Sequence, residues 1–380
     1  KFANKVLFTL HSVIHKDRII NYYLEGAQEL DKVLNIFIRV NSGGTILSYS
    51  DLLLSIATAQ WKTRDAREEI VSIVEDLNSC GDGFNFDKDF VLKSSLILSD
   101  IGDIAFKVDN FNASNMSKIE STWDAIEKAL NITVKLVSSF GYNYQTLPSN
   151  NALIPISYYI FKKDNPDGFV QSQKYLNDRI MIRKWLEICL IKRTFSGQPD
   201  NVLAPIRKIM QEYNKDFPFE LIIERFKGTN KALTFTEDEL ENILYYEYGS
   251  SHTFSVLCLL YPTLDFRNKF HQDHIFPRSL FKRKYFKEHE IKEEDYEFYL
   301  ENCNRIGNLQ LLEGIPNQEK SDIEFEKWIK KQCKKPEDLK EYLRKHKMPQ
   351  NIEYGYSNFK QFIEKRNEII KKELREALIF

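Results

Sequence analysis

The sequence predicts a mainly α-helical protein that carries an α+β domain at its C-terminal end. Up to about residue 230, apolar residues recur at steps of three and four, which is the spacing of amphipathic helices. After residue 230, two short apolar stretches and a helical stretch follow in the order strand, strand, helix. We therefore predict a helical region over residues 1–230 and a second domain over residues 231–380.

The helical region is predicted to be interrupted by loops rich in Gly, Asn and Ser. Ser48 or Ser50 is suited to cap the helix that follows the "NSGGT" turn. The predicted helical stretches are 3–16, 26–40, 50–78, 88–106, 116–140, 150–163, 167–195 and 202–214.

The C-terminal domain is predicted to begin with a helix capped by Thr236, because acidic residues fill the first turn that follows it. An apolar stretch then ends at Pro262. A strand is predicted within 266–281, ended by Pro277, and a second strand within 304–312. Two helices are predicted over 316–333 and 356–378.

Composition limits the kind of protein. The chain is 42% hydrophobic and 29% charged, which is typical of a folded soluble protein, and its formal net charge is −1. Any nucleic-acid binding must therefore come from local basic patches. The five cysteines form no CxxC pair, and no apolar run is long enough to cross a bilayer. We expect reduced thiols, a cytoplasmic location and no membrane partner.

The stretch "FRNKFHQDHIFPRSLF" contains the first candidate site, the adjacent pair Asp273 and His274. Hydrolysis of a phosphodiester needs a base for water and a cation for the phosphate. His274, with an ordinary pKa of about 6.5, suits the base, and Asp273 suits a Mg²⁺ or Mn²⁺ ligand. Neighbours on a strand point to opposite faces, but we expect the twist at the strand end to bring both to one site.

Two asparagines complete this constellation. Asn317, at the start of the predicted helix in "IPNQEKSD", supplies an amide oxygen as a second metal ligand. Asn308, in "IGNLQLL", is placed to hydrogen-bond across the strand pair and to hold the segment that bears His274.

The set "DHIFP", "GNLQLL" and "PNQEKSD" resembles the HNH, or ββα-metal, nuclease motif, including the target-strand-cutting domain of RNA-guided nucleases. The resemblance implies Asp273 and Asn317 as metal ligands, His274 as the general base and Asn308 in a structural role. It also implies that Lys320 lies near the scissile phosphate. The 33 residues between His274 and Asn308 exceed the spacing in compact HNH units.

Other polar residues near the motif have two readings each. His271 is either a further metal ligand or phosphate contact, or a half-buried strand residue. The basic insert, which we define as Lys282, Arg283, Lys284 and Lys287, either contacts phosphates of a nucleic-acid backbone or is simply solvated.

A second distinctive stretch, "NIFIRVNSGGTILSYSDLLL", lies near the N-terminus. Its Gly43–Gly44 turn, with Arg39 and Asn41 nearby, fits an anion-binding nest and equally fits an ordinary structural turn. The stretch "FIRVNSGGTILS" followed by "DLLLS" resembles the GmrSD-type family of modification-dependent restriction and phage-defence proteins. "LLYPTLDF", "DHIFPRS", "NRIGNLQLL" and "EKRNEIIKKELREAL" resemble the nuclease domain of the same family.

Members of that family pair a ParB-like nucleotide-hydrolysing domain with a C-terminal HNH domain. The nucleotide motif, an Asp-Gly-Gln-Gln-Arg-like stretch, is not found ahead of "RVNSGGT", and the sequence starts without methionine. We therefore expect that the nucleotide-hydrolysing segment is missing, and that residues 1–230 hold its remnant and a helical linker domain. Arg39, Asn41, Gly43 and Gly44 would be remnants of the nucleotide site, which would bind nucleotide only with that segment present.

The sequence thus predicts a metal-dependent DNA endonuclease of a bacterial or archaeal defence system, with modified phage DNA among its candidate substrates. Two alternatives stay open. The domain is either a module that binds nucleic acid or a partner without cutting it, or a regulatory fragment whose nuclease needs the missing segment. DNA versus RNA, the kind of modification and a homo-oligomeric state are not determined by the sequence.

Overall fold

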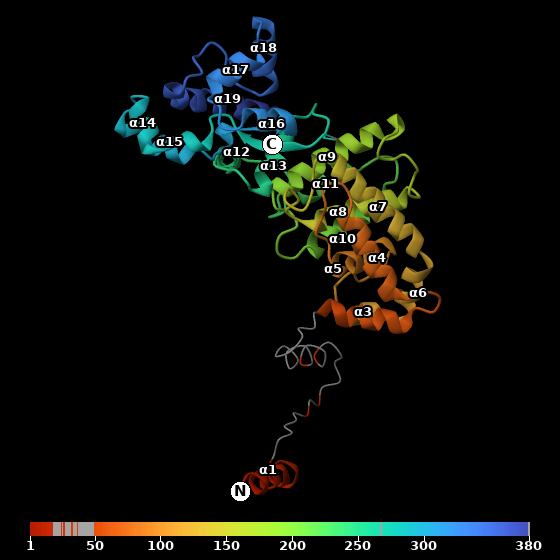
Figure 1. Cartoon of the computed structure of the whole chain (residues 1–380). Coiled ribbons are helices and arrows are strands. Elements are labelled where there is room, and N and C mark those ends of the chain that lie inside the picture. The colour runs from red at the N-terminus through yellow and green to blue at the C-terminus, as the bar shows by residue number, and fades with distance from the viewer. Residues whose placement is uncertain are drawn as a thin grey trace.

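The structure is a computed structural model, and it describes residues 1–17, 24, 26, 32, 36, 49–266 and 268–378. Arg39, Asn41, Gly43 and Gly44 lie outside these residues. The predicted fold class is confirmed, since helices dominate and a two-stranded sheet lies in the C-terminal part. Helix α1 (Phe2–His15) has no buried residue and lies apart from the other helices in Figure 1.

The helical part surrounds a helix that is apolar on nearly every side. Residues 153–160 of α8 are all buried, and α8 packs against α5, α7 and α10. Its helices are α3 (Tyr49–Gln60), α4 (Ala66–Asn78), α5 (Lys88–Leu98), α6 (Ala113–Ser121), α7 (Trp123–Ser139), α8 (Leu153–Lys162), α9 (Leu176–Ile191), α10 (Asp200–Glu212) and α11 (Phe219–Phe226). Short 3-10 turns lie at Val108–Phe111, Asn150–Ala152 and Gln173–Tyr175.

The C-terminal part lies beyond the end of the helical part that is opposite α3 and α6 (Figure 1). Its strands are β1 (Phe270–His274) and β2 (Leu309–Glu313). Its helices are α12 (Glu237–Ile243), α13 (Ser251–Leu260), α14 (Arg283–Glu288), α15 (Tyr296–Asn302), α16 (Gly314–Lys320), α17 (Phe325–Gln332), α18 (Pro336–Lys345) and α19 (Phe359–Ala377). Short 3-10 turns lie at Arg278–Leu280, Glu293–Asp295, Ile306–Asn308 and Tyr356–Asn358.

Three predicted helices are each broken in two. The stretch 116–140 is interrupted at Thr122, between α6 and α7. The stretch 50–78 is interrupted between α3 and α4, where the Asp65 side chain accepts hydrogen bonds from the first backbone N–H groups of α4 and so caps it. The stretch 316–333 is interrupted at Ser321, whose φ of 42° ends α16. The predicted cap at Thr236 is confirmed as a full capping box with Glu239.

The two strands pair antiparallel, and their register places Asp273 opposite Gln310 and His274 opposite Leu309. This pair separates two groups of buried side chains. Leu309 and Leu311 belong to the core that fills the helical part, while Leu312 belongs to a second core with residues of α17 and α19. The first core continues across residue 230, because α13 packs against both α9 and α19.

Among the described residues, no helix combines the length and the apolar character that crossing a membrane requires.

Candidate active site

Asp273 lies near the end of β1 and faces α16. Its carboxylate is buried, with 8% of the residue exposed, and accepts a hydrogen bond from Gln310 Nε2 at 2.7 Å. Lys320 Nζ lies 3.2 Å from Oδ1 and 3.1 Å from Oδ2. The same ammonium group donates to the backbone carbonyl of His274. Lys320 therefore ties both residues of the Asp-His pair to the last turn of α16.

The imidazole of His274 contacts different elements. Its Nε2 lies 2.9 Å from Asn304 Oδ1, and the ring of Tyr248 lies 4.5 Å away, centroid to centroid. Tyr248 precedes α13 and Asn304 precedes β2, so neither contact is shared with Asp273. Burial lowers the pKa of His274 below its ordinary value, whereas Asn304 and the charge of Asp273 act in the opposite direction. The imidazole is thus held neutral at pH 7.

We expected the side chains of Asp273 and His274 to converge at the strand end, but their contacts show that they do not. Asp273 points toward α16 and His274 toward the residues before α13 and β2. The reason lies in the pairing, because β1 stays in register with β2 through the pair His274–Leu309. Regular pairing preserves the alternation of faces up to the last residue of the strand.

Asn308 joins the segment that follows β1 to the segment that precedes β2. Its Oδ1 accepts from the backbone N–H of Phe276 at 2.9 Å, and its Nδ2 donates to the carbonyls of Phe276 and Cys303. Its own carbonyl accepts from the N–H of Ile275 at 2.8 Å. Asn308 is fully buried, and these contacts fix the backbone directly after His274, as predicted for this residue.

Lys320 is buried against Asp273, and its predicted place near the scissile phosphate stays a prediction. The residue is 0% exposed, so its ammonium cannot touch a phosphate that stays in solvent. The turn at Ser321 directs the chain away after Lys320, and the ammonium instead lies against Asp273. Lys320 holds a carboxylate in place, which makes it a positioning residue.

Asn317 and Lys320 are three residues apart on α16, so both side chains lie on one side of that helix. Asn317 is half-buried, and its side chain makes no hydrogen bond within the described part of the chain. His271 precedes Asp273 by two residues and thus shares its face of β1. A Cβ placed on Gly314 would lie 3.9 Å from His271 Nε2, which puts this ring beside the start of α16. Asp273 and His271 therefore share the face of β1 that lies toward α16, and Asn317 stands on that helix.

The donor set on this side is compatible with a hard divalent cation. The Asp273 carboxylate has about four lone-pair positions. Gln310 donates to Oδ2 and Lys320 to Oδ1, and the Lys320 ammonium also lies 3.1 Å from Oδ2 as an ion pair. At least one position and the Asn317 amide oxygen remain, and Mg²⁺ is commonly bound by one or two protein oxygens together with water and phosphate. No cluster of three or more His, Cys, Asp or Glu side chains suited to a metal occurs among the described residues.

Residues 229–373 match the family model for GmrSD restriction endonucleases, C-terminal domain. This part of the chain is therefore similar to the C-terminal domain of the GmrSD-type family. The match indicates a restriction endonuclease domain of the kind found in phage defence, and such a domain implies DNA as its substrate. A comparison with curated proteins found no match.

The basic insert of the GmrSD-type domain is exposed. Lys282, Arg283, Lys284 and Lys287 are all on the surface around α14, and Figure 1 shows α14 at the outer edge of the domain. Lys284 lies 3.9 Å from Glu288, at the limit of an ion pair. The insert is therefore accessible to a polyanion. Contact with nucleic-acid phosphates and simple solvation both stay predictions.

The sequence did not point to three residues of the candidate site, namely Asn304, Gln310 and Tyr248. Asn304 and Gln310 stand within the quoted stretch "NRIGNLQLL". The hydrogen-bond partner of an amide side chain cannot be inferred until the register of the two strands is known. The pairing of Asp273 with Gln310 across the strands could have identified Gln310 once the register was known. Tyr248 lies in a loop that belongs to none of the motifs quoted above.

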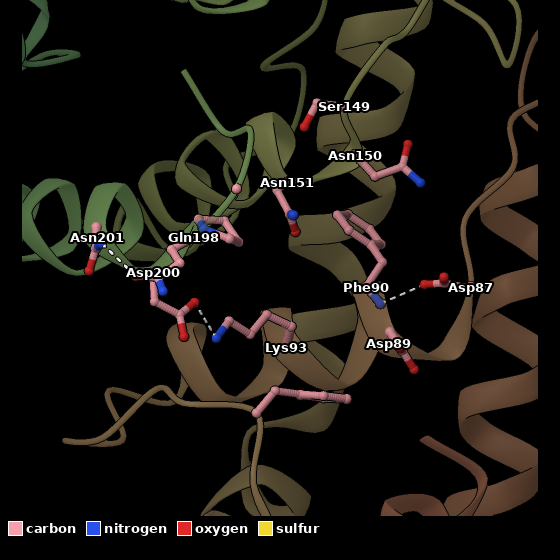
Figure 2. Close-up of a pocket in the computed structure, with 13 residues that line it drawn as sticks. Asp87, Asp89, Phe90, Lys93, Ser149, Asn150, Asn151, Gln198, Asp200 and Asn201 are labelled. Atoms are coloured by element: carbon pink, nitrogen blue, oxygen red, sulfur yellow. Dashed lines mark hydrogen bonds and ion pairs between the residues drawn. The ribbon is translucent and has the colours of Figure 1, made fainter. Parts of the chain in front are cut away.

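A separate polar pocket of about 680 Å³ lies in the helical part, outside the GmrSD-type domain. Figure 2 shows the acidic and amide side chains that line it, among them Asp89, Asn151 and Gln198. Its buried Lys93 forms an ion pair with Asp200 at 2.5 Å and donates to the carbonyl of Ile104. Because this ammonium is already neutralised, the described lining resembles no phosphate-binding site.

Proposed function

We propose that the C-terminal domain is a metal-dependent DNA endonuclease of the HNH type, with His274 as its general base. The observation that carries this proposal is the hydrogen bond between His274 Nε2 and Asn304 Oδ1. An amide oxygen only accepts, so a neutral imidazole in this contact bears its proton on Nε2. The lone pair of Nδ1 then remains to take a proton from an attacking water molecule.

The surroundings of His274 suit a base at neutral pH. Burial lowers its pKa, which keeps the imidazole unprotonated before the reaction. The negative charge of Asp273 raises that pKa, and it would stabilise the imidazolium that forms when the proton arrives. Asn304 holds the ring in the same orientation in both states, since Nε2 donates to it in each.

We assign the cation to Asp273 and Asn317, with His271 as a further candidate ligand. Mg²⁺ or Mn²⁺ bound there would neutralise the charge that develops on the phosphate. Lys320 holds the Asp273 carboxylate in place, and Asn308 fixes the backbone beside His274. Asp273 and His274 stand next to each other at the end of β1 with their side chains on opposite faces, so the proposal requires a phosphate that spans this end of the strand.

The proposed substrate is DNA, including modified phage DNA, and the proposed setting is a cytoplasmic defence system. A neighbouring nucleotide-hydrolysing segment that contains or completes the site of Arg39, Asn41, Gly43 and Gly44 would regulate cleavage. A homo-oligomeric state is compatible with this proposal and is not required by it.

Cleavage assays test the proposal directly. Purified protein should cut or nick plain and modified DNA with Mg²⁺ or Mn²⁺ and should stop when EDTA is added. His274→Ala should lose cleavage while its circular dichroism stays unchanged, and His11→Ala, in the exposed helix α1, serves as the matched control. Full cleavage by His274→Ala, or full cleavage in EDTA, would exclude the assigned mechanism.

The buried contact between Lys320 and Asp273 favours a second candidate function. The Asp273 carboxylate already has a cation partner in Lys320, and it lies on the face of β1 opposite to His274. The same arrangement would occur in a domain that binds DNA without cutting it. In that case the wild-type protein should retain DNA in a gel-shift assay and show no turnover with any divalent metal. Turnover that depends on His274 excludes this candidate.

A further inference from the structure

Arg366, in the middle of α19, is a fully buried cation surrounded by backbone carbonyls. Its Nη1 donates to the carbonyls of Ile306 and Gly307, at 3.3 and 2.8 Å. Its Nη2 donates to Leu309 at 2.7 Å and to His346 at 3.3 Å, and Nε donates to Lys347 at 3.2 Å. Among the described residues its side-chain partners are Tyr261 and Tyr342, and no carboxylate forms an ion pair with it.

These carbonyls come from two segments, residues 306–309 and residues 346–347. The first segment is the turn that carries Asn308 into β2. Asn308 in turn holds the N–H groups of Ile275 and Phe276, the two residues that directly follow His274. A continuous set of hydrogen bonds therefore runs from the guanidinium, through the turn, to the end of β1.

We propose that Arg366 is a positioning residue for His274, acting through the 306–309 turn. This inference rests on the proposed function and deepens it. A guanidinium presents its N–H donors in a rigid planar fork, so three carbonyls of one turn can be fixed in direction at once. A lysine ammonium keeps the positive charge but has three donors on a flexible stem, and it cannot reproduce that fork.

A second contact joins the same turn to α19. Gly307 packs so closely on the helix that an added Cβ would lie 2.5 Å from Asn367 Oδ1 and 3.4 Å from Ile363 Cγ2. Its φ is not in the left-handed region, so alanine is acceptable to the backbone and the conflict is with the neighbouring side chains. Gly307→Ala would therefore force either the Asn367 amide or the turn itself to shift, without changing any charge.

Arg366→Lys is the first test, and Arg375→Lys is its matched control. Arg375 lies on the same helix but is exposed, and it pairs with Glu237 at the surface. In Arg366→Lys we expect amide hydrogen exchange of residues 303–310 to rise at least tenfold, while residues 153–160 of α8 keep their protection. The hydrogen bond to Asn304 should slow the exchange of the His274 Nε2–H proton in wild-type protein, and its signal should be lost from spectra of histidine-labelled Arg366→Lys.

Cleavage by Arg366→Lys should fall at least tenfold in kcat, with KM for DNA within twofold of wild type. A role in stability alone would instead raise exchange evenly across the protein and keep the His274 signal, and that result would overturn the proposal. Unchanged exchange at 303–310 would overturn it too.

Gly307→Ala is the second test variant, and it tests the same positioning role if Arg366→Lys does not fold. It should show the same local rise in exchange and the same loss of kcat, and Gly307→Ala/Asn367→Ala should restore both, because the second change removes the conflicting side chain. Failure of that restoration would count against the turn as the connecting element. If wild-type protein does not cleave DNA, the proposed function fails, but exchange and the Nε2–H signal still decide the positioning role.

Discussion

Lys320 Nζ lies 3.1 Å from Asp273 Oδ2, and both side chains are nearly inaccessible to solvent. Burial lowers the pKa of Lys320, and the carboxylate of Asp273 partly offsets this effect. Each charge therefore depends on the other for its place in the interior. The candidate site is thus also a place where the stability of the domain is decided.

Lys320→Met should destabilise the protein strongly, because Asp273 is then left buried without a cation. Removal of one partner of a buried pair typically costs about 3–5 kcal/mol of the free energy of unfolding. Urea denaturation measures this loss, and Lys320→Met/Asp273→Asn should recover part of it. Lys327→Met, which removes an exposed partner of Glu324, should change little. Equal effects of the two single changes would contradict a buried ion pair.

Asn308→Ala should weaken both stability and cleavage. The change leaves the Phe276 N–H and the Phe276 and Cys303 carbonyls without partners in a buried place. Buried groups left unsatisfied cost roughly 1–3 kcal/mol each, although some of these will find water. Thermal melting and a cleavage assay provide the measurement. A melting temperature equal to that of the wild type would show that these hydrogen bonds of Asn308 contribute nothing to the stability of the fold.

Asn304→Leu should reduce cleavage by about 10- to 100-fold while DNA binding stays the same, by analogy with the effects of losing a partner that orients a histidine. The imidazole of His274 would lose the acceptor that fixes its Nε2–H. Asn304→Asp keeps an oxygen acceptor at this position and should retain more activity than Asn304→Leu. The reverse order of the two variants would speak against the assigned tautomer.

His346 should make the protein sensitive to acid. It is buried between α13, α18 and α19, and its pKa is lowered to about 3, first by burial and then by the charges of Lys345 and Arg366. Its other close partners are the rings of Tyr261 and Tyr342. The unfolded chain protonates His346 below pH ~6.5, whereas the folded chain does not, so the full contribution is present above that pH.

As the pH falls from about 6.5 toward 3, this residue should lower the free energy of unfolding by about 1.4 kcal/mol per pH unit. His346→Gln cannot be protonated, so its stability should fall less steeply over the same interval. Urea denaturation at several pH values compares the two slopes. Parallel curves for wild type and His346→Gln would show that His346 is not the group responsible.

The sequence predicted the parts of this protein that depend on local patterns. Apolar periodicity identified the helices, and acidic residues after Thr236 identified the capping box. The order of the two strands and the helix was also predictable, as was the hydrogen bonding of Asn308. Each of these rests on neighbours in the sequence, or on a motif whose elements are themselves local.

The parts that were not predicted depend on contacts between distant residues. That Asp65 and Ser321 would break long helical patterns was not recognised, since both stretches remain amphipathic on either side. The burial of Lys320 follows from how α16 lies against β1, which composition does not reveal. His274 and Asn304 meet because β2 starts a few residues after Asn304. The regular pairing of β1 with β2 keeps the faces of Asp273 and His274 apart, which the sequence does not reveal.

The continuity of the first core across residue 230 has a consequence for cooperativity. Side chains of α9, α13, α19 and β2 share one packed interior, so the helical part and the strands should unfold in a single transition rather than in two. A ligand that binds only the folded form of either part would then raise the melting temperature of both. A fragment cut at residue 230 would expose the apolar sides of α13 and α19, and the two halves are better regarded as one thermodynamic unit.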